Sequence, residues 1–210
     1  MHKKTAVFAA LALLPAAFSA HAALVTWEAS GRISDVTGYT EFQSGDTFNV
    51  RWSFDSDAAV LSTNNNRYTL DPSALRISYR IGANFSGQLN YQSNRGGFFY
   101  LRDNQIAPGK GPDAPLIDGL TFGLNDARFP TGMALIMRWH DTNVIQNQRI
   151  PLLPPALTDM EANSFQGGDG ADYNFVGQFN HIAAVPEAQT WAMLGAGLFA
   201  LGALARRRRA

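Results

Sequence analysis

The stretch "TFNVRWSFD", residues 47–55, carries an apolar side chain at every second position. Its apolar residues are Phe48, Val50, Trp52 and Phe54. Successive side chains of a β-strand point to opposite faces, so a period of two predicts a strand with one buried face and one polar face.

The same alternation recurs along the chain and extends this prediction to the whole central part. It appears in residues 25–29, 75–81, 85–91, 120–124, 133–139 and 173–179. Turn-forming clusters separate the runs: "SDVTG", "STNNN", "SNRGG", "APGKGPDAP", "RFPTG" and "GGDGAD". Many strands joined by turns predict an all-β fold, an antiparallel β-sandwich or jelly roll, in residues 23–182. We expect one short helix, at residues 155–162.

Composition and charge exclude several classes of function. The chain of 210 residues is 46% hydrophobic, enough for one domain with a sizeable core. It has no cysteine, which excludes disulfides, thiolate metal sites and cysteine nucleophiles. Residues 23–185 hold 11 basic and 16 acidic side chains, a formal charge of −5. Such a balance argues against a nucleic acid partner, which needs a basic surface.

The first 22 residues have the order of a secretory signal peptide. Lys3 and Lys4 precede an apolar stretch at residues 6–18, and small residues follow at Ala20 and Ala22. This order predicts export and cleavage after Ala22. The alternative is an N-terminal membrane anchor or a buried helix, which the short apolar stretch and Pro15 disfavour.

The C-terminal end predicts a single transmembrane helix at residues 190–205. Residues 191–205 contain no charged side chain and would span about 22 Å as a helix, short of a hydrocarbon core of about 30 Å. Trp191 at one interface and snorkelling arginines at the other lengthen the segment that a bilayer accommodates. Arg206, Arg207, Arg208 and Arg209 then act as a cytoplasmic membrane stop, within residues 206–210. The body is expected beyond the inner membrane, facing the periplasm.

Val185, Pro186 and Glu187, followed by the apolar segment and the arginine cluster, resemble the PEP-CTERM sorting signal of Gram-negative bacteria. The resemblance places the Pro-Glu motif in a linker at residues 183–189. It implies an exosortase as partner, contact with the inner membrane during sorting, and release to the envelope, biofilm or extracellular matrix of an organism that makes exopolysaccharide. The family usually has a second proline where this chain has Ala188, which predicts slower cleavage if that proline is needed.

The candidates for a metal site are acidic residues close to turns. Asp55 and Asp57, with Asp46 nearby, could offer oxygen ligands to calcium. Asp169 and Asp172 lie in "GGDGADYNF", a single imperfect copy of a calcium-binding nonapeptide. The alternative interpretation, a solvated strand end and a Gly-Asp turn, is favoured at both places. We therefore predict no cofactor.

Catalytic signatures are sparse. His140 stands beside Asp141, but neighbouring residues of a strand point to opposite faces and would not form a base with its orienting acid. His181 is the other histidine of the body. A glycan hydrolase would need two carboxyl groups about 5 to 9.5 Å apart, which the sequence permits without indicating.

Aromatic residues support a binding function better than catalysis. Trp27, Trp52, Trp139, Tyr91 and Phe99 could stack on sugar rings if exposed, although most of them alternate with polar residues as a core would. Three hypotheses remain open. The first is a noncatalytic exported protein that binds or organises exopolysaccharide or surface material. The others are an exported glycan hydrolase and a purely structural matrix protein.

Overall fold

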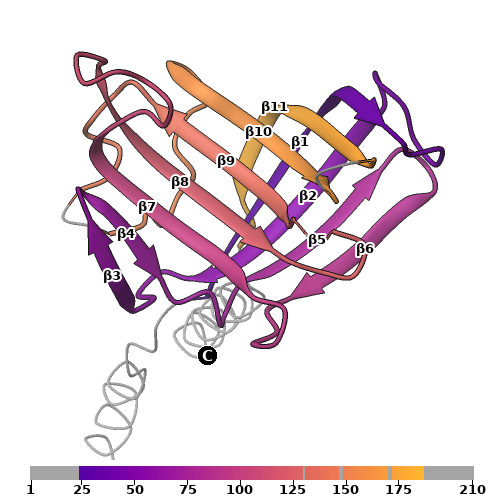
Figure 1. The fold of residues 1–210 in the computed structure, drawn as a ribbon, viewed down its shortest axis with the longest axis horizontal. Helices are drawn as coiled ribbons and strands as arrows, with labels where there is room; N and C mark the ends of the chain where they lie inside the picture. Colours follow the sequence, from indigo (N-terminus) through magenta and orange to yellow (C-terminus); the bar gives the residue numbers. More distant parts are fainter. Residues whose placement is uncertain (1–23, 130, 147–148, 170–171, 187–210) are drawn as a thin grey trace, which may run out of the picture.

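The computed structural model describes residues 24–129, 131–146, 149–169 and 172–186, and these form one antiparallel sheet of eleven strands (Figure 1). The strands are β1 (Leu24–Thr37), β2 (Thr47–Asp55), β3 (Val60–Asn64), β4 (Arg67–Leu70), β5 (Arg76–Ile81), β6 (Phe85–Asn90), β7 (Gly97–Ile106), β8 (Leu116–Leu124), β9 (Met133–Trp139), β10 (Met160–Gly168) and β11 (Asn174–Ala184). Their order across the sheet is β3-β4-β7-β8-β9-β10-β11-β1-β2-β5-β6.

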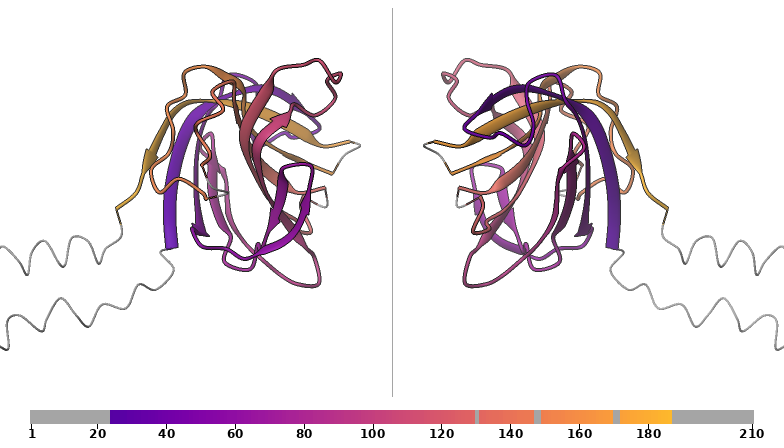
Figure 2. Two further views of the ribbon diagram at one scale, coloured as in Figure 1. Left: turned by 90° about the vertical axis from the view of Figure 1, so that its left-hand side faces the viewer. Right: turned by 90° about the vertical axis from the view of Figure 1, so that its right-hand side faces the viewer.

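The sheet curls strongly, so that its two halves face each other across a shared core (Figure 2). Rings from β2 meet rings from the opposite half: Trp52 lies 6.1 Å from Phe122 of β8, and Phe54 lies 5.9 Å from Phe99 of β7, between ring centroids. These large side chains occupy alternate positions of their strands. Their burial accounts for the curl, because a sheet that closes on its own apolar face removes that face from water.

The alternation in residues 47–55 produces the buried face that it predicts. Phe48, Val50, Trp52 and Phe54 are all at most 2% exposed. In β1, Trp27 lies directly opposite Trp52, and their rings meet edge to face at 5.9 Å. The register of β1 and β2 thus places apolar side chains of both strands on the same inner side.

β11 occupies the middle of the sheet, between β10 and β1, although it is last in the chain. Its C-terminal end pairs with the N-terminal end of β1, with Ala184 opposite Trp27. The next residue, Val185, donates a backbone hydrogen bond of 2.8 Å to the carbonyl of Thr26. The two ends of the body therefore lie side by side (Figure 2).

One fully buried acid fixes an irregular part of the sheet. Asp118 of β8 accepts hydrogen bonds from the backbone N–H of Asn104, at 2.9 Å, and of Ile145, at 2.6 Å. Asn104 has a φ of 53° and lies in the bulge that interrupts the pairing of β7 with β8. Asp118 thereby supplies an acceptor to each of two backbone donors that the strand ladder leaves out. Burial raises the pKa of the Asp118 carboxyl, and these two hydrogen bonds oppose the rise.

The all-β prediction is confirmed, and its antiparallel character with it. The strands share one continuous hydrogen-bonded sheet, so the more specific sandwich or jelly roll is not established. The helix expected at residues 155–162 is wrong. Met160 begins β10 opposite Trp139, and Asp159 has a φ of 57°, in the left-handed region that a right-handed helix cannot contain.

The predicted signal peptide and sorting helix lie outside the described residues. Within the described ranges, no helix has the length and apolar character needed to cross a membrane. β3, β4, β7 and β10 are strands that the alternation did not identify.

Candidate functional site

The aromatic residues expected to stack on sugars lie mostly in the core. Trp27 and Trp52 are 0% exposed, Phe99 is 1% exposed and Trp139 is 2% exposed. Tyr91 is half-buried and packs against the same core. Stacking on sugars was conditional on exposure, and the alternative interpretation, that most of these rings belong to the core, is confirmed for four of the five.

The acidic calcium candidates take part in turns. Asp55 accepts a 2.8 Å hydrogen bond from the backbone N–H of Asp57. Asp169 accepts hydrogen bonds from the backbone N–H groups of Asp172, at 3.0 Å, and Tyr173, at 2.9 Å. Over the described parts of the chain, no group of three or more histidine, aspartate or glutamate side chains is arranged to hold a metal ion.

His140 and Asp141 do not form a catalytic pair. Asp141 accepts two hydrogen bonds of 2.9 Å from Asn143, one from its backbone and one from its side chain, and these lower the pKa of the Asp141 carboxyl. His140 is exposed, and its backbone N–H bonds to the carbonyl of Asp159. His181 is exposed on β11.

The convex side of β4 and β7 to β10, which we call the outer face, carries a different set of chemically capable side chains. Three rows of directly opposed residues cross it. The first row is Phe98, Gly123, Ala134 and Gln166. The second row is Thr69, Tyr100, Thr121, Ile136 and Ser164. The third row is Arg67, Arg102, Gly119, Arg138 and Ala162.

A stacked aromatic pair on the outer face is accessible to solvent. Phe98 and Tyr100 of β7 have ring centroids 5.4 Å apart and planes inclined by 17°. Both side chains are half-buried, whereas Phe99 between them points into the core. Phe98 lies flat over Gly123, where even a Cβ atom would collide with its ring. Small residues under the pair thus let the rings lie along the sheet.

A groove of about 370 Å³ adjoins this pair at one end of the outer face. Phe98 forms part of its wall, and Gly132, Ala134 and Gly167 are among the small residues that line it. Thr131, Gln166 and Asn174 add hydroxyl and amide groups. An apolar ring beside several amide and hydroxyl groups suits a ligand that has both apolar faces and hydroxyls.

The third row brings three guanidinium groups together. Arg102 is 8% exposed and donates a 3.3 Å hydrogen bond from Nη1 to the Thr121 hydroxyl. Burial, followed by the positive charges of Arg138 and Arg67, lowers the pKa of the Arg102 guanidinium to about 10. Arg67 lies over the Tyr100 ring at 5.1 Å, and Arg138 pairs with Glu161 at 3.3 Å.

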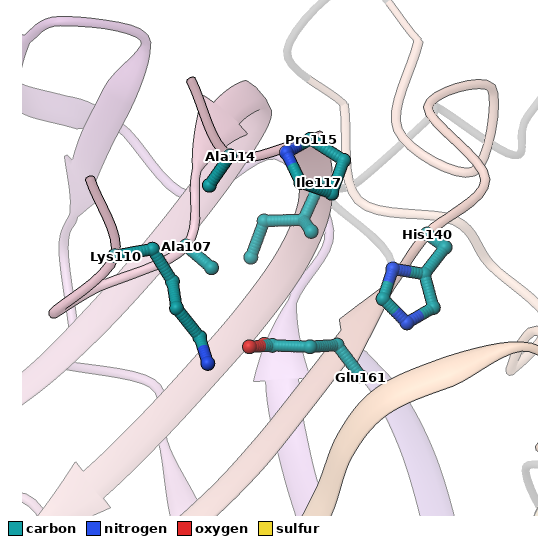
Figure 3. Close-up of a pocket in the computed structure, with 7 residues that line it drawn as sticks. All are labelled: Ala107, Lys110, Ala114, Pro115, Ile117, His140 and Glu161. Carbon is teal, nitrogen blue, oxygen red and sulfur yellow. The ribbon is translucent and has the colours of Figure 1, made fainter. Parts of the chain in front are cut away.

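A pocket of about 240 Å³ lies at the other end of the same face (Figure 3). Ala107, Ala114, Pro115 and Ile117 give it an apolar back, and Lys110, His140 and Glu161 add polar groups. Lys110 comes from the loop after β7, whereas Glu161 comes from β10. Glu161 also pairs with Arg138, so one residue of the pocket wall contacts the arginine row.

The predicted sorting residues begin where the sheet ends. Val185 still bonds to β1, and Pro186, the last described residue, is exposed. Glu187, the arginines at 206–209 and the signal-cleavage residues Ala20 and Ala22 lie outside the described residues. The Pro-Glu motif therefore follows the folded edge directly.

The sequence did not indicate the candidate binding residues of β7. In "GGFFYLR", residues 96–102, aromatic and apolar side chains stand at both odd and even positions, so no alternation marks one face as exposed. The arginines are far apart in sequence and become neighbours only through the register of four strands. The available signal was the cluster of consecutive aromatic residues itself.

A family model of the PEP-CTERM protein-sorting motif matches residues 184–209. It includes the Val-Pro-Glu residues, the apolar segment and the arginine cluster that carried the resemblance. No curated protein and no solved structure matches the chain.

Proposed function

We propose that this chain, a PEP-CTERM sorting-signal protein that is exported and recognised by an exosortase, is a noncatalytic protein that binds polysaccharide. The sorting signal directs it to the cell envelope or the cell exterior. The body then acts there as a binding module, with the outer face as its binding surface.

The observation that carries the proposal is the stacked, half-exposed pair Phe98 and Tyr100 beside the groove. The apolar C–H faces of a pyranose ring pack on aromatic rings, while its hydroxyls need hydrogen-bonding partners. The groove offers such partners in Thr131, Gln166 and Asn174. The rows of the outer face extend this surface along the strands, which suits an extended chain better than a single small sugar.

The acid–base chemistry of the face supports binding over hydrolysis. Glycoside hydrolysis uses two carboxyl groups about 5 to 9.5 Å apart. Among the described residues that line the pocket of Figure 3, Glu161 is the one carboxylate, and Arg138 already pairs with it. Among its described lining residues, the pocket therefore lacks the second carboxyl group that glycoside hydrolysis requires.

The test compares binding and turnover in one set of variants. The natively exported protein is titrated against a panel of polysaccharides by calorimetry, and released reducing ends are assayed on the same samples. Phe98→Ala/Tyr100→Ala removes both rings, and Leu153→Ala, at a residue that is 72% exposed on another surface, serves as the control. Two aromatic contacts at about 0.5 to 1.5 kcal/mol each predict a loss of affinity of roughly five- to a hundredfold.

Each outcome has a defined meaning. Loss of binding in the aromatic double variant alone, without release of reducing ends, supports the proposal. Turnover of any polysaccharide would establish the hydrolase instead. A protein that binds no polysaccharide, with folding confirmed by its thermal transition, would be a structural matrix protein.

A further inference from the structure

The arginine row marks a place on the outer face where positive charge accumulates without full compensation. Arg67 of β4 and Arg102 of β7 are directly opposed, a position where like charges destabilise a sheet. Arg138 of β9 lies across Gly119 from Arg102, two strands away and so about 10 Å between backbones. Among the described residues, Glu161 is the only acid that forms an ion pair with the row.

The hydrogen-bonding capacity of these guanidinium groups is largely unused. Arg102 has one side-chain hydrogen bond, and its buried Nε has no partner within the described part of the protein. Arg138 has its single bond to Glu161, and its Nε is likewise buried without a partner. A guanidinium has five N–H donors in a fixed fork. The row therefore concentrates positive charge, and an incoming anion can reach it at the partly exposed side chains of Arg67 and Arg138.

The absence of a side chain at Gly119 leaves room for the stem of the half-buried Arg138 beside the buried Arg102. A Cβ atom there would lie 3.3 Å from the Arg138 Cγ and 3.1 Å from the carbonyl of Met137. The stem of Arg138 thus passes over the glycine toward the middle of the row.

The body as a whole has a formal charge of −5, so this positive row is a local exception. An acidic surface repels polyanions in general, whereas a local cluster of positive charge binds those polyanions that fit its geometry. Carboxylates match the planar fork of arginine in a bidentate manner. The row lies two residues along β7 from Tyr100, whose ring Arg67 covers at 5.1 Å.

We propose that the arginine row binds the carboxylates of an acidic polysaccharide whose sugar rings pack on Phe98 and Tyr100. This inference rests on the proposed function and deepens it, because it names the chemical class of the polysaccharide. Aromatic rings recognise the pyranose faces, and the guanidinium groups recognise the acidic substituents that a neutral glycan lacks. Glu161 competes with the ligand for Arg138.

The experiment uses two polymers that share a backbone and differ in charge: polygalacturonate and its fully methyl-esterified form. The natively exported protein is titrated with each by calorimetry in about 0.05 M and about 0.5 M salt, where screening of exposed charges differs severalfold. Polygalacturonate should bind at least about tenfold more tightly than the ester at low salt, and this difference should shrink at high salt.

Three variants separate the contributions. Arg67→Gln/Arg138→Gln should remove most of the difference in affinity between polygalacturonate and the ester. Arg32→Gln/Arg80→Gln, which removes two exposed charges from β1 and β5, is the charge-matched control and should retain the difference. Glu161→Gln should tighten polygalacturonate binding severalfold, a gain that misfolding cannot produce.

The results distinguish this inference from the proposed function. Equal binding of both polymers, abolished by loss of the aromatic rings, would overturn the carboxylate site and keep the polysaccharide-binding function. Failure to bind any polysaccharide of the panel would overturn both. Equally tight binding of double-stranded DNA would also overturn the inference, since it would show a general cation site.

Discussion

Replacement of Gly123 by alanine should dismantle the aromatic pair while leaving the fold intact. A Cβ at Gly123 would collide with three ring atoms of Phe98, so the ring must move. Phe98 is half-buried on the outer face and can rotate toward solvent, which spares the backbone. The folded state then loses the stabilisation of the ring pair, about 0.5 to 1.5 kcal/mol. Alanine offsets this by about 0.5 to 1 kcal/mol, because it loses less conformational entropy than glycine when the chain folds.

These two contributions nearly cancel, so the midpoint of thermal unfolding should change by less than about 4 °C. Affinity for polysaccharide should fall roughly two- to tenfold, because the platform is displaced. Circular dichroism melting and calorimetric titration measure the two quantities on one sample.

Gly177→Ala provides a matched contrast on the inner face. Its Cβ would lie 2.6 Å from a ring atom of Phe48, but Phe48 is 2% exposed and has no free space to enter. Overpacking of this kind costs about 1 to 3 kcal/mol, while binding by the folded fraction should be unchanged. A large stability loss in Gly123→Ala, or full affinity with Phe98 displaced, would refute the reasoning.

Three further changes test other parts of the structure. Asp118→Asn should lower the free energy of unfolding by about 1 to 3 kcal/mol in urea titrations, because an amide has one oxygen for two buried backbone donors, and equal stability would contradict this role. Hydrogen bonds from Arg51 and then Asn49 hold the pKa of Glu28 below its ordinary 4.5, so its contribution is present above that value and lost as the pH falls through the folded pKa. Glu28→Gln should therefore cost at most about 1 kcal/mol at pH 7 and progressively less as the pH falls through the folded pKa, as a pH series of melts would reveal. Pro186→Ala should slow C-terminal processing, so that the intact mass retains the tail; unchanged processing would show that the proline is dispensable.

The strands with one polar face were predictable from the sequence, and those without one were not. β2 alternates cleanly because Phe48, Val50, Trp52 and Phe54 meet the core and the residues between them are polar. β7 carries apolar side chains on both sides, since Phe98 and Tyr100 cover the outer face while Phe99 fills the core.

The short hairpin of β3 and β4 was read as a turn because of its asparagines. Asn65 and Asn66 do form that turn, with φ values of 47° and 60°, but the residues on either side pair as strands. Asparagine tolerates the left-handed conformation that such a two-residue hairpin requires.

The candidate site depended on information that no local pattern contains. Which side chains oppose Arg102 is decided by strand order and register, and these follow from the packing of the whole core. The sorting signal, in contrast, could be recognised from the sequence, because its parts are contiguous in the chain, at residues 184–209, and do not depend on the fold.

Because β11 lies in the middle of the sheet, the sheet cannot be completed until this late strand has been exported. Without β11, the pairing order falls apart into two separate sheets, one ending at β10 and the other beginning at β1. The strand that joins them is the last of the described strands, so we expect it to be exported after the others. Until Ala184 has crossed, the aromatic faces of both halves have no common core to close, and such nonlocal pairing is slow to form. Because Val185 and Pro186 directly follow β11, we expect the sheet to be completed as the sorting motif is exported.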